Sequence, residues 1–267
     1  MEFFISCKAI PIHISDTEKN ARTIVLLHGY LETLDVWDEF VKQIAPQFRV
    51  LRIDLPGHGL SGTKPDINTM DFSAEVLHEV FQKCAIQDAV LVGHSMGGYV
   101  AQAFAANYLN HVRGLVFFHS TPNPDSEEKK KEREREIALI REGKLHLLAK
   151  QSFSRMFADD NKMHLKEKIT ALEEIAEIHE PAGIAACLEG MKHRPDRNEW
   201  LQSFNKPLLL VFGEKDDYIT KEAAQNLANK FSRSQVLWLK NSGHNGFIEE
   251  PETVAEKLID FTTQAYM

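Results

Sequence analysis

Ser95 is the residue of this sequence whose surroundings most clearly predict chemistry. It lies between Gly93 and Gly97 in the spacing G-x-S-x-G, after an apolar run (89–92) and before an alanine-rich stretch (99–108). This order predicts a strand, a sharp turn and a helix, and side chains at positions 93 and 97 would collide with the joined elements. Such a turn exposes the serine Oγ beside backbone N–H groups, which suits a nucleophile that forms an oxyanion. A glycine-rich turn without chemistry has the same pattern, so a base and an acid must be found elsewhere.

Candidates for both partners occur downstream of the serine, each after an apolar run typical of a buried strand. Two adjacent carboxylates, Asp216 and Asp217, follow the run 207–213. His244 follows the run 235–240, and it is the histidine that stands at a strand end after both the serine and the acids. A serine, a histidine and a carboxylate in hydrogen-bond contact can form and hydrolyse an acyl-enzyme.

Composition limits the partners and the compartment. The chain has 267 residues, 43% of them hydrophobic, with a net charge of −8, which is enough apolar material for one large α/β domain and too acidic a chain to attract nucleic acid or anionic lipid. We therefore expect a small-molecule partner. Cys7, Cys84 and Cys187 are too far apart for a metal-ligand motif and predict reduced structural thiols. No basic leader or run of about 18 apolar residues is present, which favours the cytoplasm.

The elements that would position these residues alternate between strand and helix patterns. The sequence predicts an opening hairpin from 3–8 and 10–15, and a helix over 71–84 with Asp71 as its N-cap. Further buried strands are predicted at 23–27, 49–54 and 114–118, and further helices at 36–45 and 221–231. A phosphate-binding loop does not fit the glycines after residue 54, because no Lys-Ser/Thr pair follows them.

Three motifs together resemble the α/β-hydrolase superfamily. They are His28-Gly29, Asp54-Leu55-Pro56-Gly57-His58-Gly59-Leu60-Ser61 and Gly93-His94-Ser95-Met96-Gly97-Gly98. The resemblance covers about the first 120 residues and resumes near Pro207. It implies an α/β fold with an eight-stranded, mostly parallel sheet, helices on both faces, a helical cap inserted after the sixth strand, and the catalytic order serine, acid, histidine.

The resemblance also assigns roles to single positions. Three residues after Gly213 the family has its acid, which selects Asp216 over Asp217, with Ser95 as nucleophile and His244 as base. The backbone N–H groups of Tyr30 and Met96 would form the oxyanion hole. Thr220 departs from the family, in which proline is frequent at that position. His28 is expected to brace its turn, and the residues expected to line the pocket are His28, Leu31, His94, His119 and Phe247.

Residues 122–205 contain helix patterns and no strand pattern, so we expect a helical cap there and a core of 1–121 and 206–267. Within it, residues 127–136 hold five acidic and five basic side chains, which predicts a solvated helix face. The cap histidines lack a repeated ligand spacing, and no metal or cofactor is expected.

We therefore expect a serine hydrolase, in first place a carboxylic ester hydrolase for a small or medium acyl substrate. Carbon–carbon bond hydrolases, lyases of menaquinone synthesis, proline aminopeptidases and perhydrolases share the same triad and stay open. A non-catalytic ligand-binding module on the same scaffold is a further alternative. Substrate identity and oligomeric state are not determined by the sequence pattern.

Overall fold

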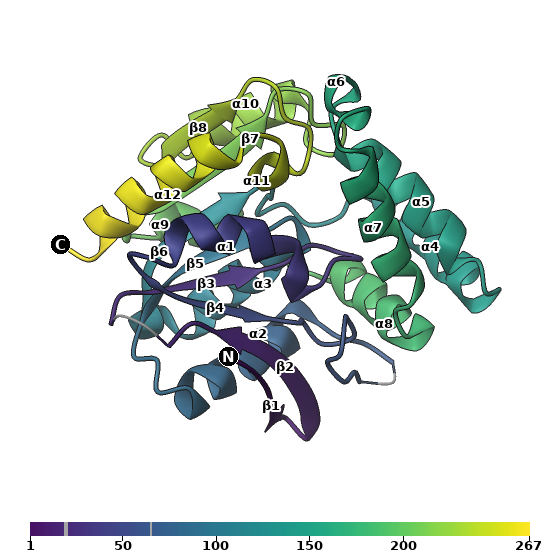
Figure 1. Ribbon diagram of the computed structural model, residues 1–267, viewed down its shortest axis with the longest axis horizontal. Coiled ribbons are helices and arrows are strands. Elements are labelled where there is room, and N and C mark those ends of the chain that lie inside the picture. The colour runs from purple at the N-terminus through teal and green to yellow at the C-terminus, as the bar shows by residue number, and fades with distance from the viewer. Residues whose placement is uncertain (19–20, 65) are drawn as a thin grey trace.

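A central sheet organises the computed structural model, which describes residues 1–18, 21–64 and 66–267 (Figure 1). Its strand order is β1-β2-β4-β3-β5-β6-β7-β8. The strands are β1 (Glu2–Cys7), β2 (Ile10–Asp16), β3 (Thr23–Leu27), β4 (Arg49–Ile53), β5 (Ala89–His94), β6 (Val112–Phe118), β7 (Leu208–Gly213) and β8 (Gln235–Leu239). These bounds lie within two residues of every predicted strand end.

Among the described strands, β2 is the one that runs against the others. β1 pairs antiparallel with β2, and β2 antiparallel with β4, whereas the pairs from β4 through β3 to β8 are parallel. The expectation of an eight-stranded, mostly parallel sheet opened by a hairpin is confirmed. In the centre, Leu27 of β3 is in register with Gly93 of β5. The loops that follow these two strands therefore emerge side by side, which brings Tyr30 and Ser95 to one edge of the sheet.

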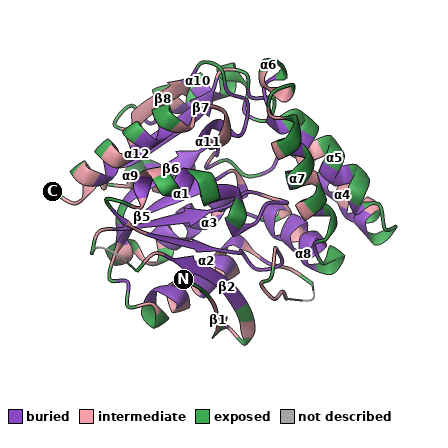
Figure 2. Cartoon of the chain, in the orientation of Figure 1, coloured by how far each residue is buried: buried purple, intermediate pink, exposed green. Residues whose placement is uncertain are grey.

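Helices cover both faces of the sheet (Figure 1). On one face α1 (Asp38–Ile44), which follows the 3-10 turn Leu34–Trp37, packs against α12 (Pro251–Ala265), and on the other α2 (Met70–Lys83) packs against α3 (Met96–Asn107). The remaining core helical segments are Leu109–His111 (3-10), α10 (Lys221–Lys230) and α11 (Gly246–Glu249). The strands β3 to β7 are almost wholly buried (Figure 2), since apolar side chains occupy both faces of a parallel sheet.

The predicted N-cap of α2 is wrong. Thr69, not Asp71, has extended backbone dihedral angles at the start of α2, and its side-chain oxygen accepts a hydrogen bond from the Phe72 N–H. Asp71 lies inside the first turn, where its carboxylate contacts the guanidinium of Arg197 at 2.7 Å. An acidic residue is favourable anywhere in a first turn, so its presence alone did not identify the cap.

Five helices between β6 and β7 form a layer beyond the sheet, at the right of Figure 1. They are α4 (Glu127–Arg141), α5 (Leu145–Met156), α6 (Asp159–Lys162), α7 (Lys166–Glu177) and α8 (Pro181–Lys192), with α4 packed on α8 and α5 on α7. A sixth helix, α9 (Asn198–Ser203), sits beside core elements instead: its Asn198 accepts a hydrogen bond from Lys230 of α10 at 2.8 Å. The helical layer over the strand ends is therefore α4 to α8, and α9 returns the chain to the sheet.

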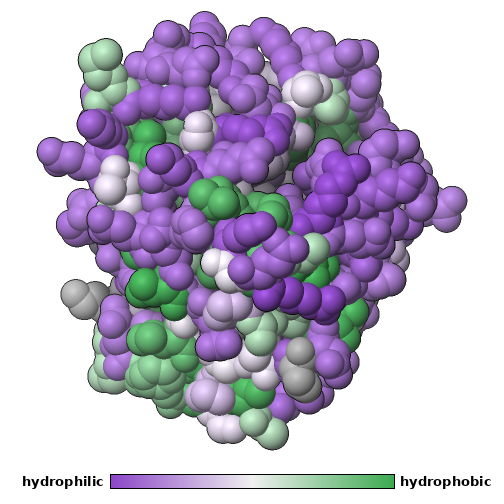
Figure 3. All heavy atoms as spheres, turned by 90° about the vertical axis from the view of Figure 1, so that its right-hand side faces the viewer, coloured by the Kyte–Doolittle hydropathy of each residue, from purple (hydrophilic) through white to green (hydrophobic). Residues whose placement is uncertain are grey.

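The outer face of this helical layer is mostly hydrophilic, interrupted by apolar patches (Figure 3). Among the helices of the described residues, none combines the length and the apolar character needed to cross a membrane. The layer is fixed to the core by hydrogen bonds. His179 Nε2 lies 3.3 Å from the Glu32 carbonyl oxygen, the Cys187 thiol donates to the Pro56 carbonyl oxygen at 3.0 Å, and the His244 N–H donates to the Met156 carbonyl oxygen at 2.7 Å.

Candidate active site

Ser95 occupies the turn between β5 and α3 in a strained backbone conformation. Its φ of +49° and ψ of −113° are rare for a residue with a side chain. The turn is held because the Ser95 N–H donates to the Phe118 carbonyl oxygen at 2.9 Å, and the Ser120 hydroxyl donates to the Ser95 carbonyl oxygen at 2.8 Å. A Cβ added to Gly97 would lie 2.7 Å from the carbonyl oxygen of His28, so the chain needs glycine there. These contacts fix Ser95 in the turn, where it is partly exposed and lines a cavity.

Two backbone N–H groups next to this turn have no hydrogen-bond partner among the described residues. One belongs to Met96, the first residue of α3, and the other to Tyr30, in the loop after β3. Because Leu27 and Gly93 are in register, the loop bearing Tyr30 emerges beside the turn that bears Ser95. Unpaired amides at a helix N-terminus attract negative charge. We propose that they form the oxyanion hole expected from the sequence.

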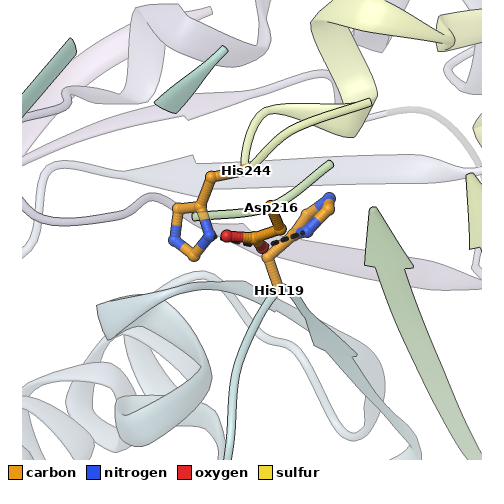
Figure 4. Close-up of side chains that lie close together, drawn as sticks. All are labelled: His119, Asp216 and His244. Atoms are coloured by element: carbon orange, nitrogen blue, oxygen red, sulfur yellow. Dashed lines mark hydrogen bonds and ion pairs between the residues drawn. The ribbon is translucent and has the colours of Figure 1, made fainter. Parts of the chain in front are cut away.

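His244 and Asp216, the expected base and acid, are in direct contact (Figure 4). His244 Nδ1 lies 2.8 Å from Asp216 Oδ2. The other carboxylate oxygen of Asp216 accepts from the N–H groups of Tyr218 and Ile219, at 2.7 and 3.0 Å. Burial alone would raise the pKa of Asp216, but the charge of His244 and the hydrogen bonds from the neighbouring imidazoles hold that pKa well below its usual range. Asp216 is therefore ionised, whereas Asp217 is exposed and contacts no imidazole.

His119 contacts the same carboxylate, a contact that the sequence did not predict. Its Nδ1 lies 3.0 Å from Asp216 Oδ2, and its Nε2 accepts from the Gly246 N–H at 3.3 Å (Figure 4). Since Nε2 accepts, Nδ1 carries the proton and donates it to Asp216. Burial lowers the pKa of His119 to about 4, so this second imidazole is neutral near pH 7. Its φ of +48° turns it toward the carboxylate.

A fully buried pair, Glu32 and His94, lies beneath the nucleophile. Glu32 Oε2 is 2.8 Å from His94 Nδ1 and accepts from the Gly29 N–H at 2.6 Å, while His94 Nε2 donates to the His244 carbonyl oxygen at 2.8 Å. Burial opposes the charged form of His94, but the charge of Glu32 raises the pKa of His94 above its usual value. Through these hydrogen bonds the pair connects the loop after β3 with the loop that carries His244, and His94 itself directly precedes Ser95.

The cavity over Ser95 has a volume of about 410 Å³. Tyr30, Ser95, His119 and His244 from the core line it. Of the five residues expected to line the cavity, His119 does so and the other four do not. His28, Leu31, His94 and Phe247 are instead buried below the cavity floor, which corrects that part of the prediction. Each faces the core because the strand ends are closed by packed side chains. His28, for example, braces its turn through Nδ1 to the Gly29 carbonyl oxygen at 2.7 Å and through Nε2 to the Leu55 N–H at 2.9 Å.

The roof of the cavity contains charged residues that sequence reasoning missed. Arg133 and Glu136 on α4 line the cavity, together with Asp125 and Arg194. The expectation of a solvated face over 127–136 is wrong at Arg133, which is 6% exposed. Alternating charge does not distinguish a residue that faces a cavity from one that faces solvent, so the sequence carried no signal for it.

One group of residues in the described part of the chain has metal-ligand types and spacing, namely His119, Asp216 and His244. Both imidazole Nδ1 atoms already face the carboxylate as N–H donors, and His119 Nε2 is occupied by Gly246. Ordinary hydrogen bonds therefore account for every contact in this group. The contacts within this group therefore do not require a metal ion.

Comparisons with known proteins agree with this geometry. A pimeloyl-[acyl-carrier protein] methyl ester esterase from Yersinia enterocolitica is 25% identical over 246 residues, which cover 91% of this chain and 93% of that protein. A monoacylglycerol lipase from Mus musculus is 26% identical over 259 residues, covering 91% of this chain and 76% of that protein. A malate-bound thermophilic esterase from Thermogutta terrifontis superposes with a TM-score of 0.94 at 27% identity, over 100% of both chains.

The family model described as the alpha/beta hydrolase fold matches residues 22–251, a range that includes Ser95, Asp216 and His244. Because that match spans most of the sequence, we conclude that this chain belongs to the alpha/beta hydrolase family.

Proposed function

We propose that this protein is a carboxylic ester hydrolase in which Ser95 is the nucleophile, His244 the general base and Asp216 the acid that orients it. The observation that carries the proposal is the strained turn at Ser95, whose φ is +49°, beside a cavity that His244 also lines. A serine in this geometry has its Oγ presented to a substrate and a base within the same pocket. Relatives that act on esters support the same class.

The mechanism follows from the protonation states. His244 Nδ1 donates to ionised Asp216, so Nε2 is free to accept the Ser95 hydroxyl proton as Oγ attacks the ester carbonyl carbon. The negative charge that forms on the carbonyl oxygen would be stabilised by the N–H groups of Tyr30 and Met96. Protonated His244 then gives its proton to the leaving alcohol. Water, deprotonated by the same histidine, releases the acid and restores the free Ser95 hydroxyl.

The helical insertion contributes the roof of the pocket. We assign residues 122–205 to a cap on a core of 1–121 and 206–267, with α4 to α8 as the part that covers the strand ends. A cavity of about 410 Å³ fits a small or medium acyl group. Cap residues line much of this cavity, so the cap determines which ester enters, while the catalytic groups come from the core.

The test combines labelling with turnover. Purified protein should react stoichiometrically with a fluorophosphonate at Ser95, and it should hydrolyse p-nitrophenyl esters with a preference for short or medium acyl chains. A substrate of carbon–carbon hydrolases, assayed in parallel, should be turned over far more slowly. Tight ligand binding without turnover would instead assign the protein as a binding module, and faster carbon–carbon cleavage would assign it to that class of hydrolase.

A further inference from the structure

Two arginines in the roof of the cavity share one carboxylate. Arg133 on α4 contacts Asp125 through Nε and through Nη2, the latter at 3.3 Å. Arg194, which follows α8, contacts the same carboxylate through Nη1 at 2.6 Å. Asp125, Arg133 and Arg194 are 7%, 6% and 9% exposed. We call these three residues the Arg133–Arg194 cluster. It combines two guanidinium charges with one carboxylate, so it carries a net positive charge away from bulk water.

Each guanidinium keeps one terminal nitrogen without a partner. Arg133 Nη1 and Arg194 Nη2 form no hydrogen bond within the described residues, and neither is among the polar atoms that are fully shielded. One face of the Arg194 guanidinium is covered by the Tyr99 ring, with 4.0 Å from Cζ to the ring centroid. Both arginines line the cavity that contains Ser95. Because both nitrogens are unpaired and accessible on residues that line the cavity, they can donate to an acceptor inside it.

The other charged residues around the cavity do not occupy these two nitrogens. Lys129 and Glu132 pair with each other at 2.8 Å. Glu136, three residues after Arg133, forms no ion pair with it. Burial raises the pKa of Glu136 and the charge of Arg133 opposes that rise, so Glu136 reduces the positive potential of the cluster without bonding to it. Asp217 is exposed, and the Arg155 guanidinium instead lies 4.8 Å from the centroid of the Tyr218 ring.

We propose that the Arg133–Arg194 cluster is a subsite for an anionic group of the substrate. The ester would carry a carboxylate or phosphate at the end remote from the bond that Ser95 attacks. This inference rests on the proposed ester hydrolysis and specifies its substrate class as esters that carry one anionic group. The free Nη1 of Arg133 and Nη2 of Arg194 would each donate to an oxygen of that group, and hydrogen bonds between a guanidinium and a carboxylate or phosphate are among the strong ones in proteins.

A purely structural role for the cluster makes a different prediction. The arginines do fix the cap, since Arg194 also donates to the carbonyl oxygens of Asn123 and Met191, at 3.1 and 2.9 Å. A clamp of this kind supports all substrates equally. An anion subsite favours charged substrates alone, so the ratio between two substrates separates the two roles.

The experiment compares monomethyl adipate with dimethyl adipate, which share an acyl chain and differ by one charge. Wild-type protein should have the higher kcat/KM for the monoanion. Arg133→Gln and Arg194→Gln should each lower the ratio of the two kcat/KM values by about tenfold or more, the size expected for a lost charge-assisted contact. Arg135→Gln, an exposed change on the same helix, should leave the ratio unchanged. Arg133→Lys should restore part of it.

The remaining outcomes contradict either the subsite or the proposed function. A wild-type preference for the diester, or a ratio that both glutamine variants preserve while total activity falls, would overturn the subsite and leave a structural clamp. If no ester is hydrolysed, the proposed function fails, and calorimetry with Ser95→Ala then tests the subsite by itself. Adipate binding in that experiment identifies a carboxylate site, and binding of inorganic phosphate identifies a phosphate site. Binding of neither anion overturns the inference.

Discussion

His119 donates a hydrogen bond from Nδ1 to Asp216 Oδ2 at 3.0 Å, on the oxygen that also faces His244 Nδ1. One carboxylate oxygen thus receives two imidazole N–H groups, of which the His119 group stays neutral because burial lowers the pKa of His119 to about 4. A neutral donor stabilises the charge of Asp216 without competing as a base. It also holds the carboxylate in place beside His244, so we expect His119 to act as a positioning residue.

Replacing His119 should therefore weaken the position of the acid. His119→Asn tolerates the positive φ but removes the imidazole donor, so the Asp216 carboxylate loses one of the hydrogen bonds that hold it against His244. We expect kcat for ester hydrolysis to fall by about tenfold while KM stays close to that of wild type. His146→Asn, an exposed histidine of the cap, is the control. A kcat identical to that of wild type would show that His119 is only a packing residue.

Removing the nucleophile should abolish turnover. Ser95→Ala should lower kcat for ester hydrolysis by about 10⁴-fold or more and prevent fluorophosphonate labelling, with the thermal midpoint of unfolding close to that of wild type. Ser154→Ala, an exposed serine of the cap, should retain full labelling. Wild-type kcat in the Ser95 variant would exclude the acyl-enzyme mechanism.

Asp216 and Asp217 are adjacent and carry the same functional group, so substitution of Asp217 is the control for substitution of Asp216. Asp216→Asn removes the carboxylate that fixes the tautomer of His244 and should reduce kcat by about 10⁴-fold. Asp217→Asn changes the same atoms on an exposed side chain and should reduce kcat by less than about tenfold. Steady-state kinetics on one p-nitrophenyl ester suffices. A larger loss from the Asp217 variant would mean that Asp217 is the acid.

The sequence predicted the sheet well, because the central strands β3, β5 and β7 are nearly continuous apolar runs whose ends are marked by glycine, proline or polar residues. Contacts that depend on which direction a side chain faces were not predictable. Phe247 and His94 stand next to motif residues, but the close packing of the strand ends turns them into the core. In the sequence, Arg133 cannot be distinguished from the other charged residues of α4. It becomes a cavity residue because α8 packs against α4.

Acid should destabilise the fold through its buried neutral histidines. Burial lowers the pKa of both His119 and His179 from 6.5 to about 4. Between these values the unfolded chain binds protons that the folded chain does not, so the stabilisation is complete above about pH 6.5 and is lost as pH falls toward 4. For each histidine, the full loss between about pH 6.5 and pH 4 is on the order of 3 kcal/mol.

Urea unfolding at pH 7 and at pH 5 measures this loss. His179→Gln keeps a side-chain donor for the Glu32 carbonyl oxygen and removes the titrating group, so the free energy of unfolding should depend less steeply on pH. The exposed His146→Gln should keep the wild-type slope. Equal slopes in all three proteins would show that His179 does not titrate between these values.

The buried pair of Glu32 and His94 makes the last prediction. Glu32 holds the Gly29 N–H, one residue before Tyr30, while His94 holds the carbonyl oxygen of His244. Glu32→Gln leaves a buried imidazole without its counterion and should lower the free energy of unfolding by about 3–5 kcal/mol. Because the loop of Tyr30 loses its anchor, the rate of Ser95 labelling should also fall, by about tenfold.

A double-mutant cycle separates the pair from its surroundings. Glu32→Gln, His94→Asn and the double variant are compared by urea unfolding and by the rate of fluorophosphonate labelling. Each single substitution leaves the other buried residue without its partner. The double variant should therefore be less destabilised than the sum of the two single variants, with a coupling free energy of about 1–3 kcal/mol. Labelling rates should show the same coupling, because the pair joins the oxyanion loop to the loop of the base. Additive effects in both measurements would mean that the two residues act independently, and the connection between the loops would then have to pass through the sheet itself.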